Sequence, residues 1–136
     1  MTQDPCRLLR RALAVNAWTT AANGFAFLVA GHVLGPIFGL APVVLWGLGA
    51  GFLGFAAHAG AVARKERISR AEAAYFTIAD AAYVVASMAV LLGFPHLMSG
   101  LGRLYFAAAA DLVALFAIAE YAGLRRLTRA AAPATA

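Results

Sequence analysis

The stretch that decides the fold is Arg64-Lys65-Glu66-Arg67-Ile68-Ser69-Arg70, in which five of seven residues are charged. Two further basic clusters lie far from it on either side: Arg7, Arg10 and Arg11, and Arg125, Arg126 and Arg129. These three clusters hold ten of the eleven Lys and Arg residues, and Arg103 is the eleventh. Lys and Arg beside apolar segments set the orientation of membrane helices, because they stay on the cytoplasmic side. The pattern predicts that both termini are cytoplasmic.

Four apolar segments lie between the three basic clusters, two in each interval. The two segments of each interval are joined by a connection without Lys or Arg, at residues 35–41 and 93–102. Each segment has about the 20 residues needed to cross a bilayer. They are Val15–Leu34, Pro42–Ala63, Ala73–Leu92 and Leu104–Leu124. Only 12% of the chain is charged, against about 25% in soluble domains. We therefore predict an all-α integral membrane protein with one domain over residues 1–136. It is an antiparallel up-down bundle of four transmembrane helices, with a short cytoplasmic N-terminal segment and a frayed C-terminal tail.

Local motifs mark where these helices begin and end. Ser69 and Glu72 have the spacing of a capping box, which predicts the start of the third helix. Gly35-Pro36 and Ala41-Pro42 predict a break between the first two helices. Ala22-Asn23 aligns with Ala79-Asp80, so the chain carries either a weak repeat of two helical hairpins or a coincidence between alanine-rich helices.

Polar residues form one stripe on the first helix and another on the third. Asp80, Tyr83 and Ser87 share a face of the third helix at spacings of three and four. Thr20 and Asn23 lie at a similar depth in the first helix, so we expect them to donate hydrogen bonds to Asp80. The Asp80 carboxyl then either accepts a proton or cation, or it is part of a hydrogen-bonded clasp between helices.

Two more acids lie in the fourth helix. Asp111 is near its middle, where a charge is most costly, so it is a candidate interhelical hydrogen-bond donor or proton site. Glu120 follows nine residues later on almost the opposite face. Because it is close to the cytoplasmic end, we expect Glu120 to reach lipid headgroups or Arg125.

The second helix carries a row of small residues. Gly47, Gly51 and Gly54 form a ridge at spacings of four and three, which predicts tight packing against another helix. His58 continues the ridge. We expect His58 to point into the protein at the level of Glu120, as a packing residue or as the partner of a carboxyl group.

The sequence also argues against several classes of function. Its only cysteine, Cys6, cannot make an intramolecular disulfide or a cysteine-based zinc site. Two outward histidines, His32 and His96, are too few to predict a metal or haem site, so we predict no cofactor. The bases are explained by membrane orientation, so we predict no nucleic-acid partner. The sequence contains no nucleophile–base motif, and we predict that the protein is not an enzyme.

Two hypotheses for function remain. The first is a small inner-membrane protein that is a non-enzymatic structural or accessory subunit of a membrane complex. The alternative is a small proton- or cation-coupled transporter, a homodimer in which Asp80 and Asp111 are the protonation sites. Under both hypotheses, the predicted partners of the protein are the lipid bilayer and either another membrane protein or a second copy of the chain.

Overall fold

Four long helices make up most of residues 6–130, the part of the chain that the computed structural model describes. They are α1 (Arg7–Phe38), α2 (Pro42–Ala63), α3 (Arg70–Gly93) and α4 (Gly100–Ala130), with a short 3-10 helix, η1 (Pro95–Leu97), before α4. All four long helices are long and apolar enough to span a membrane. Residues 7–14 of the predicted N-terminal segment are part of α1. The predicted frayed tail lies outside the described residues.

The motifs at the helix ends had different outcomes. The capping box is confirmed, because the Ser69 hydroxyl accepts from the Glu72 N–H and the Glu72 carboxylate accepts from the Ser69 N–H. Of the two predicted breaks, the one at Ala41-Pro42 is confirmed, since α2 begins at Pro42, whereas the one at Gly35-Pro36 is wrong, since α1 continues through Pro36 to Phe38. The helix ends only at Gly39, whose φ of 74° lets the chain reverse. Leu40 N–H then donates to the Gly35 carbonyl at 2.8 Å, which satisfies one of the last carbonyls of the helix.

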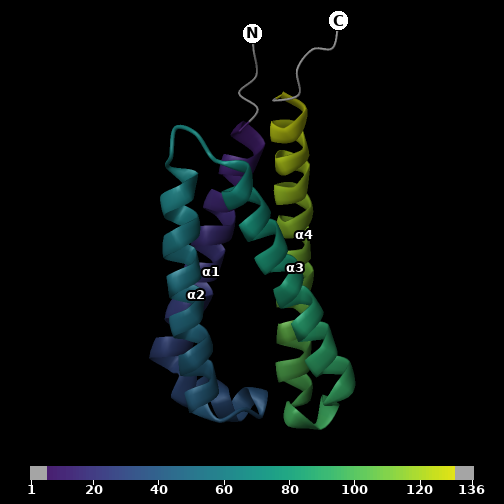
Figure 1. The fold of residues 1–136 in the computed structure, drawn as a ribbon. Coiled ribbons are helices and arrows are strands. Elements are labelled where there is room, and N and C mark those ends of the chain that lie inside the picture. Colours follow the sequence, from purple (N-terminus) through teal and green to yellow (C-terminus); the bar gives the residue numbers. More distant parts are fainter. Residues whose placement is uncertain (1–5, 131–136) are drawn as a thin grey trace, which may run out of the picture.

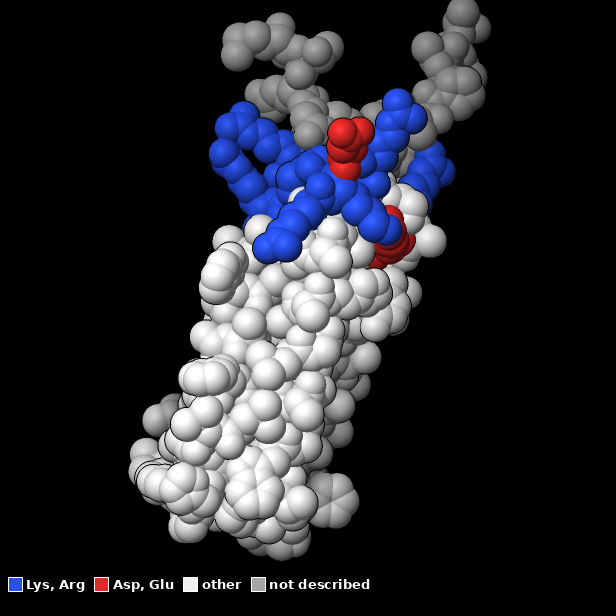
Figure 2. Space-filling model, turned by 90° about the vertical axis from the view of Figure 1, so that its left-hand side faces the viewer, with Lys and Arg blue, Asp and Glu red and all other residues white. Residues whose placement is uncertain are grey.

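The helices pack as two hairpins, α1 with α2 and α3 with α4, and the hairpins meet chiefly through α1 and α4 (Figure 1). The start of α1, the α2–α3 connection and the end of α4 lie at one end of the molecule. Figure 2 shows Lys and Arg gathered at this end, with an uncharged face below it. We call it the basic end, and the opposite end the far end. Whether the two hairpins are a repeat stays a prediction.

Glycines bring α1 and α2 together, but they are not those of the predicted ridge. A Cβ on Gly24 would lie 2.9 Å from the Gly49 carbonyl oxygen, and one on Gly49 would lie 2.7 Å from the Gly24 oxygen. By contrast, the predicted packing of Gly47, Gly51 and Gly54 is wrong: all three are exposed, and a Cβ there would meet nothing within 4 Å. The reason is helix rotation, because these residues lie on the face of α2 away from Gly49.

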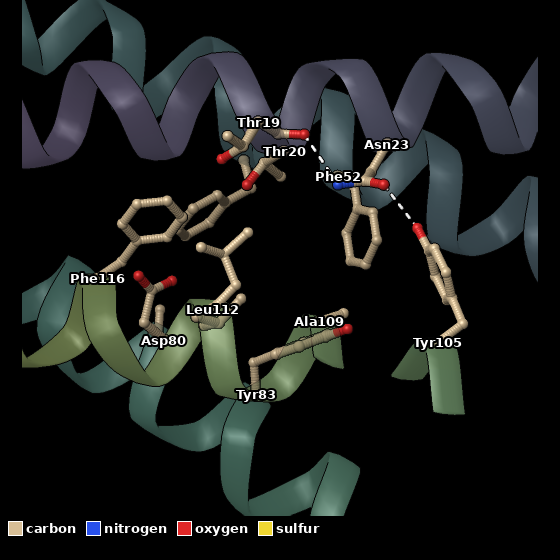
Figure 3. A pocket seen from close by; sticks show the side chains of 13 residues that line it. Thr19, Thr20, Asn23, Phe52, Asp80, Tyr83, Tyr105, Ala109, Leu112 and Phe116 are labelled. Carbon is tan, nitrogen blue, oxygen red and sulfur yellow. Dashed lines mark hydrogen bonds between the residues drawn. The ribbon is translucent and has the colours of Figure 1, made fainter. Parts of the chain in front are cut away.

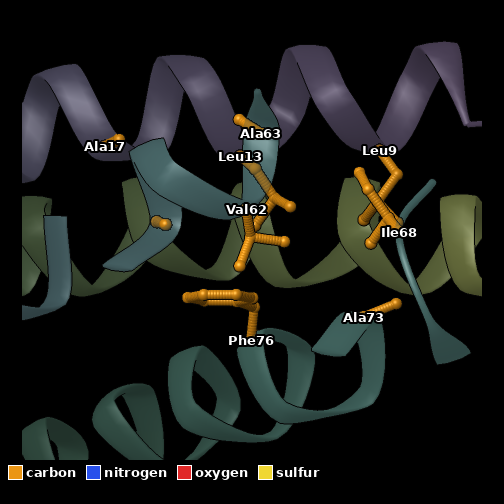
Figure 4. Close-up of a cluster of buried hydrophobic side chains, with 9 residues drawn as sticks. Leu9, Leu13, Ala17, Val62, Ala63, Ile68, Ala73 and Phe76 are labelled. Atoms are coloured by element: carbon orange, nitrogen blue, oxygen red, sulfur yellow. The ribbon is translucent and has the colours of Figure 1, made fainter. Parts of the chain in front are cut away.

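Two clusters of buried apolar side chains hold the bundle. The cluster toward the basic end joins α1, α2, the α2–α3 connection and α3 (Figure 4). Its buried members are Leu9, Leu13, Ala17, Ala59, Val62, Ala63, Ile68, Ala73 and Phe76. The cluster toward the far end is mostly aromatic and consists of Phe27, Phe38, Leu45 and Phe106. The polar interior of the protein lies between them.

Ser99 joins the two hairpins at the far end. Its N–H donates to the Phe38 carbonyl at 2.8 Å, and its hydroxyl donates to the Ile37 carbonyl at 2.6 Å. The same hydroxyl accepts from the Gly102 N–H at 3.0 Å, which caps the start of α4. One side chain therefore satisfies backbone groups at the end of α1 and the start of α4.

Candidate functional site

Three polar side chains are buried together near the middle of the bundle: Asn16 on α1, Asp80 on α3 and Glu120 on α4. Their exposed fractions are 1%, 4% and 0%. Asn16 and Asp80 each adjoin buried apolar residues of their own helix. Asn16 lies between Leu13 and Ala17 of the cluster toward the basic end, and Asp80 is one turn beyond Phe76. We call these three residues the polar trio.

The Asn16 amide links the two acids of the polar trio. Its Nδ2 donates to Asp80 Oδ2 at 2.6 Å and to Glu120 Oε1 at 3.1 Å. The amide oxygen is also used, since it accepts from the Thr20 hydroxyl at 3.0 Å. Two carboxyl groups from different helices thus accept hydrogen bonds from the same neutral amide group.

The predicted donors to Asp80 therefore need correction. Thr20 donates to Asn16 rather than to the carboxyl. Asn23 donates to the Thr19 carbonyl at 3.0 Å and accepts from the Tyr105 hydroxyl at 2.6 Å. Asp80 is hydrogen-bonded at the level of Asn16. Asn23 lies two turns further along α1, which is too far for a hydrogen bond to Asp80.

The prediction for Glu120 is also wrong. Glu120 does not extend toward headgroups or Arg125; it is fully buried and hydrogen-bonded to Asn16. Close packing of α4 against α1 turns it inward, because Gly123, one turn further, lies directly against Leu9. Its second oxygen, Oε2, is buried and has no hydrogen-bond partner among the described residues. Glu120 is thus a buried acid with one oxygen that no described group hydrogen-bonds.

A cavity of about 250 Å³ adjoins the polar trio on its far-end side. All four helices line it, and Figure 3 shows α1 on one side and α3 and α4 on the other. Asp80 lies at the end nearer the basic end, and the Tyr105–Asn23 hydrogen bond at the other. The remaining lining is mostly apolar and aromatic: Phe52, Phe55, Ala79, Tyr83, Ala109, Leu112, Val113 and Phe116, together with Thr19 and Thr20.

Several predicted site residues come together here, and others do not. Tyr83 lines the cavity and packs edge-on against Phe52, with ring centroids 5.8 Å apart. Ser87, one turn on, lies outside this cavity in a separate hollow toward the start of α2. Asp111 is exposed on the outer face of α4 and does not line the cavity. Asp80 and Asp111 therefore do not form one site.

The expected inward position of His58 is wrong. His58 is exposed and lies against the rings of Tyr75 and Phe76, at centroid distances of 5.3 and 5.0 Å. It contacts the outer edge of α3 and does not approach Glu120. The rotation of α2 that exposes Gly51 and Gly54 also places His58 outside.

Asn16 is the site residue that sequence reasoning left out of its candidates. It belongs to the same stripe as Thr20 and Asn23, one turn nearer the basic end than Thr20. A signal was present, because Asn16 follows the first basic cluster at five residues and Glu120 precedes the last one by five. Equal distances from the same end place the two residues at equal depth.

The side chains of the site were also compared with those that hold metal ions in proteins. Within residues 6–130, no three His, Cys, Asp or Glu side chains gather as they do around a bound metal ion. The polar trio offers two acids and an amide. In comparisons with family models, curated proteins and solved structures, this chain matched none.

Proposed function

We propose that this protein is a small proton-coupled membrane transporter that exchanges an organic cation for a proton. In this proposal the four helices cross a bacterial-type inner membrane as antiparallel neighbours. Both termini and the basic end face the cytoplasm, as the clustering of Lys and Arg favours. Asp80 and Glu120 carry the proton, and the adjoining cavity receives the cation.

One observation carries the proposal: Asp80 belongs both to the polar trio and to the wall of the cavity. A group that binds in the cavity therefore meets a carboxyl that is coupled, through Asn16, to a second carboxyl. An acid that only joins helices by a hydrogen bond does not need a cavity beside it. Here the acid pair and the cavity share a side chain.

The coupling follows from the energetics of buried charge. Two carboxylates in an apolar interior repel each other and lack the solvation that would stabilise them. Without a cation, the Asp80–Glu120 pair keeps a proton. A cation in the cavity stabilises the ionised carboxylate, so the proton is released as the cation binds. One positive charge then replaces another, and the charge of the site is unchanged.

The cavity wall indicates the kind of cation. Five aromatic rings line it: Phe52, Phe55, Tyr83, Tyr105 and Phe116. Aromatic faces attract alkylated ammonium groups, while the apolar lining disfavours a hydrated inorganic ion. A volume of about 250 Å³ suits a small substituted ammonium ion. We infer an amphipathic organic cation as the substrate class.

Proton release on cation binding tests this function. Tetraethylammonium is added to the detergent-solubilised protein in a weak buffer, and the pH change is measured. We expect about one proton released per bound cation, since the two compete for one acid pair. Asp80→Asn should abolish the release, and Asp111→Asn, outside the cavity, is the matched control. Binding without any proton release would refute the coupling.

The accessory-subunit hypothesis stays a prediction. Exposed apolar side chains cover all four helices, and such a surface suits lipid and a protein partner alike. Purification from native membranes in a gentle detergent separates the two functions. A larger complex that retains this chain, together with unaltered behaviour of Asp80→Asn, would favour the accessory role.

A further inference from the structure

The outer face of α4 carries a row of exposed side chains centred on Asp111. The row consists of Leu104, Ala108, Asp111, Leu115 and Ile118, at spacings of four, three, four and three. The three large apolar members are between 63% and 67% exposed. This heptad spacing is the one by which two helices pack along each other over several turns. We call these five residues the Asp111 stripe.

The position of Asp111 conflicts with a surface that meets only lipid. It lies well inside α4, with seven residues of uncharged helix between it and Arg103 and eight before Glu120. A carboxyl group facing hydrocarbon there is costly, and acids at such depths face protein or water. The cavity is on the opposite side of α4, where Ala109 and Val113 line it.

The rest of the fold prevents α4 from turning Asp111 inward. Gly123 packs on Leu9 and Gly102 packs on Phe38, both with no room for a larger side chain. Glu120 is held on Asn16 by a hydrogen bond. Rotation of α4 would bury Asp111 only by exposing Glu120 and breaking these contacts. No hydrogen bond or ion pair joins Asp111 to another side chain of residues 6–130, so its partner is to be sought outside this part of the chain.

We propose that a second copy of this chain covers the Asp111 stripe, with the two α4 helices parallel across a twofold axis. The axis places Asp111 opposite Asp111 of the other copy at the same depth, as an isologous interface requires. Carboxylic acids are self-complementary, because a protonated one both donates and accepts. The small side chains of Ala107, Ala108 and Ala114 beside it allow the helices to approach closely.

The end of the stripe nearer the basic end also fits a second copy. The stripe ends before Arg125, whose guanidinium carbon lies 6.0 Å from the centre of its own Tyr121 ring. The two copies therefore meet along apolar residues and a single acid. A different partner protein would need its own hydrogen-bonding group at the depth of Asp111, whereas the second copy supplies one by symmetry.

Disulfide cross-linking in native membranes tests the interface. In a Cys6→Ala background, single cysteines are placed at Leu104, Ala108, Leu115 and Ile118 and oxidised. Val29 on α1 and Val85 on α3, exposed at 59% and 68%, are the matched controls. We expect a product of twice the chain mass from the stripe positions and at least ten times less from the controls. Equal cross-linking everywhere, or none on the stripe, overturns the proposal.

The mass of the cross-linked product also distinguishes a second copy from any other protein on the stripe. A cross-linked product of some other mass means that a different protein covers the stripe. Substitution at Asp111 adds an independent readout: Asp111→Asn keeps a self-complementary group and should keep the dimer. Asp111→Leu should weaken dimerisation in detergent about tenfold, because it removes the interhelical hydrogen bonds. Because Asp111 lies outside the cavity, proton release by tetraethylammonium should persist in the Asp111→Leu monomer, so dimer and transport site are tested separately.

Discussion

Inner and outer faces of these helices carry the same residue types in opposite surroundings. Asp80 is buried on Asn16, whereas Asp111 is exposed on α4. A Cβ on Gly49 would meet the backbone of α1, whereas a Cβ on Gly51, two residues on, would meet nothing within 4 Å. Residue type alone therefore did not reveal which face is inside. In a bundle whose helices are apolar all round, packing partners and depth decide what a residue does.

The largest expected difference between the two faces is in transport. Glu120→Gln removes one acid of the buried pair but keeps its size, so uptake of tetraethylammonium driven by a pH gradient should fall to the level of empty vesicles. Asp111→Asn should leave uptake near the wild-type rate. Radiolabelled uptake into proteoliposomes measures both. If the two variants lose activity equally, the inner and outer acids are not functionally distinct.

Next in size is the stability lost on removing the shared amide. Asn16→Ala leaves Asp80 and Glu120 without their donor and should destabilise the fold by about 2–3 kcal/mol. Asn23→Ala, two turns further along α1 in a half-buried position, should cost about 1 kcal/mol. Thermal unfolding in one detergent compares them. Equal losses would mean that the polar trio contributes no more than an ordinary hydrogen bond.

The glycines of α2 give a smaller contrast. Gly49→Ala forces a Cβ against the Gly24 carbonyl oxygen and should destabilise the protein by about 1–2 kcal/mol. Gly51→Ala meets no atom and should be neutral or stabilising by up to about 1 kcal/mol, since alanine favours the helix. The same unfolding assay applies. A destabilising Gly51→Ala would restore the predicted ridge as a packing surface.

The smallest expected contrast is between two tyrosines of α4. Tyr105→Phe removes the hydrogen bond to Asn23 at the far end of the cavity and should cost about 0.6 kcal/mol. Tyr121→Phe, on the exposed face, should leave stability unchanged within error. Parallel unfolding curves distinguish them, and an identical response would show that the Tyr105 hydroxyl adds nothing to the fold.

Sequence reasoning predicted well wherever a signal lies along the chain. The charged stretch between Arg64 and Arg70 separates α2 from α3, and the capping box at Ser69 marks the start of α3 to the residue. Asp80 was also predicted as a candidate site residue; it is buried as expected, and its role in function stays a prediction. Local charge and hydrogen-bonding motifs act within a few residues, so the order of residues is enough to reveal them.

Several predictions that depend on helix rotation failed, although the inward face of α3 with Asp80 and Tyr83 was predicted correctly. Soluble helices show their inner face by their apolar residues, but here both faces of α2 and α4 are apolar. The outward positions of Gly51 and His58 and the inward position of Glu120 depend on where glycines let backbones touch. Those contacts join residues far apart in the sequence, such as Gly24 with Gly49 and Gly123 with Leu9, and no local pattern encodes them.

The two short connections at the far end have a consequence for how the chain enters a bilayer. Residues 39–41 and 94–99 contain no Lys, Arg, Asp or Glu. A hairpin inserted from one side must carry its tip through the hydrocarbon, and an uncharged tip avoids the largest cost of that passage. The charged stretch between α2 and α3 resists the same passage. We therefore expect the pairs α1–α2 and α3–α4 to insert as separate units, with α1–α2 able to cross before α3–α4 is made.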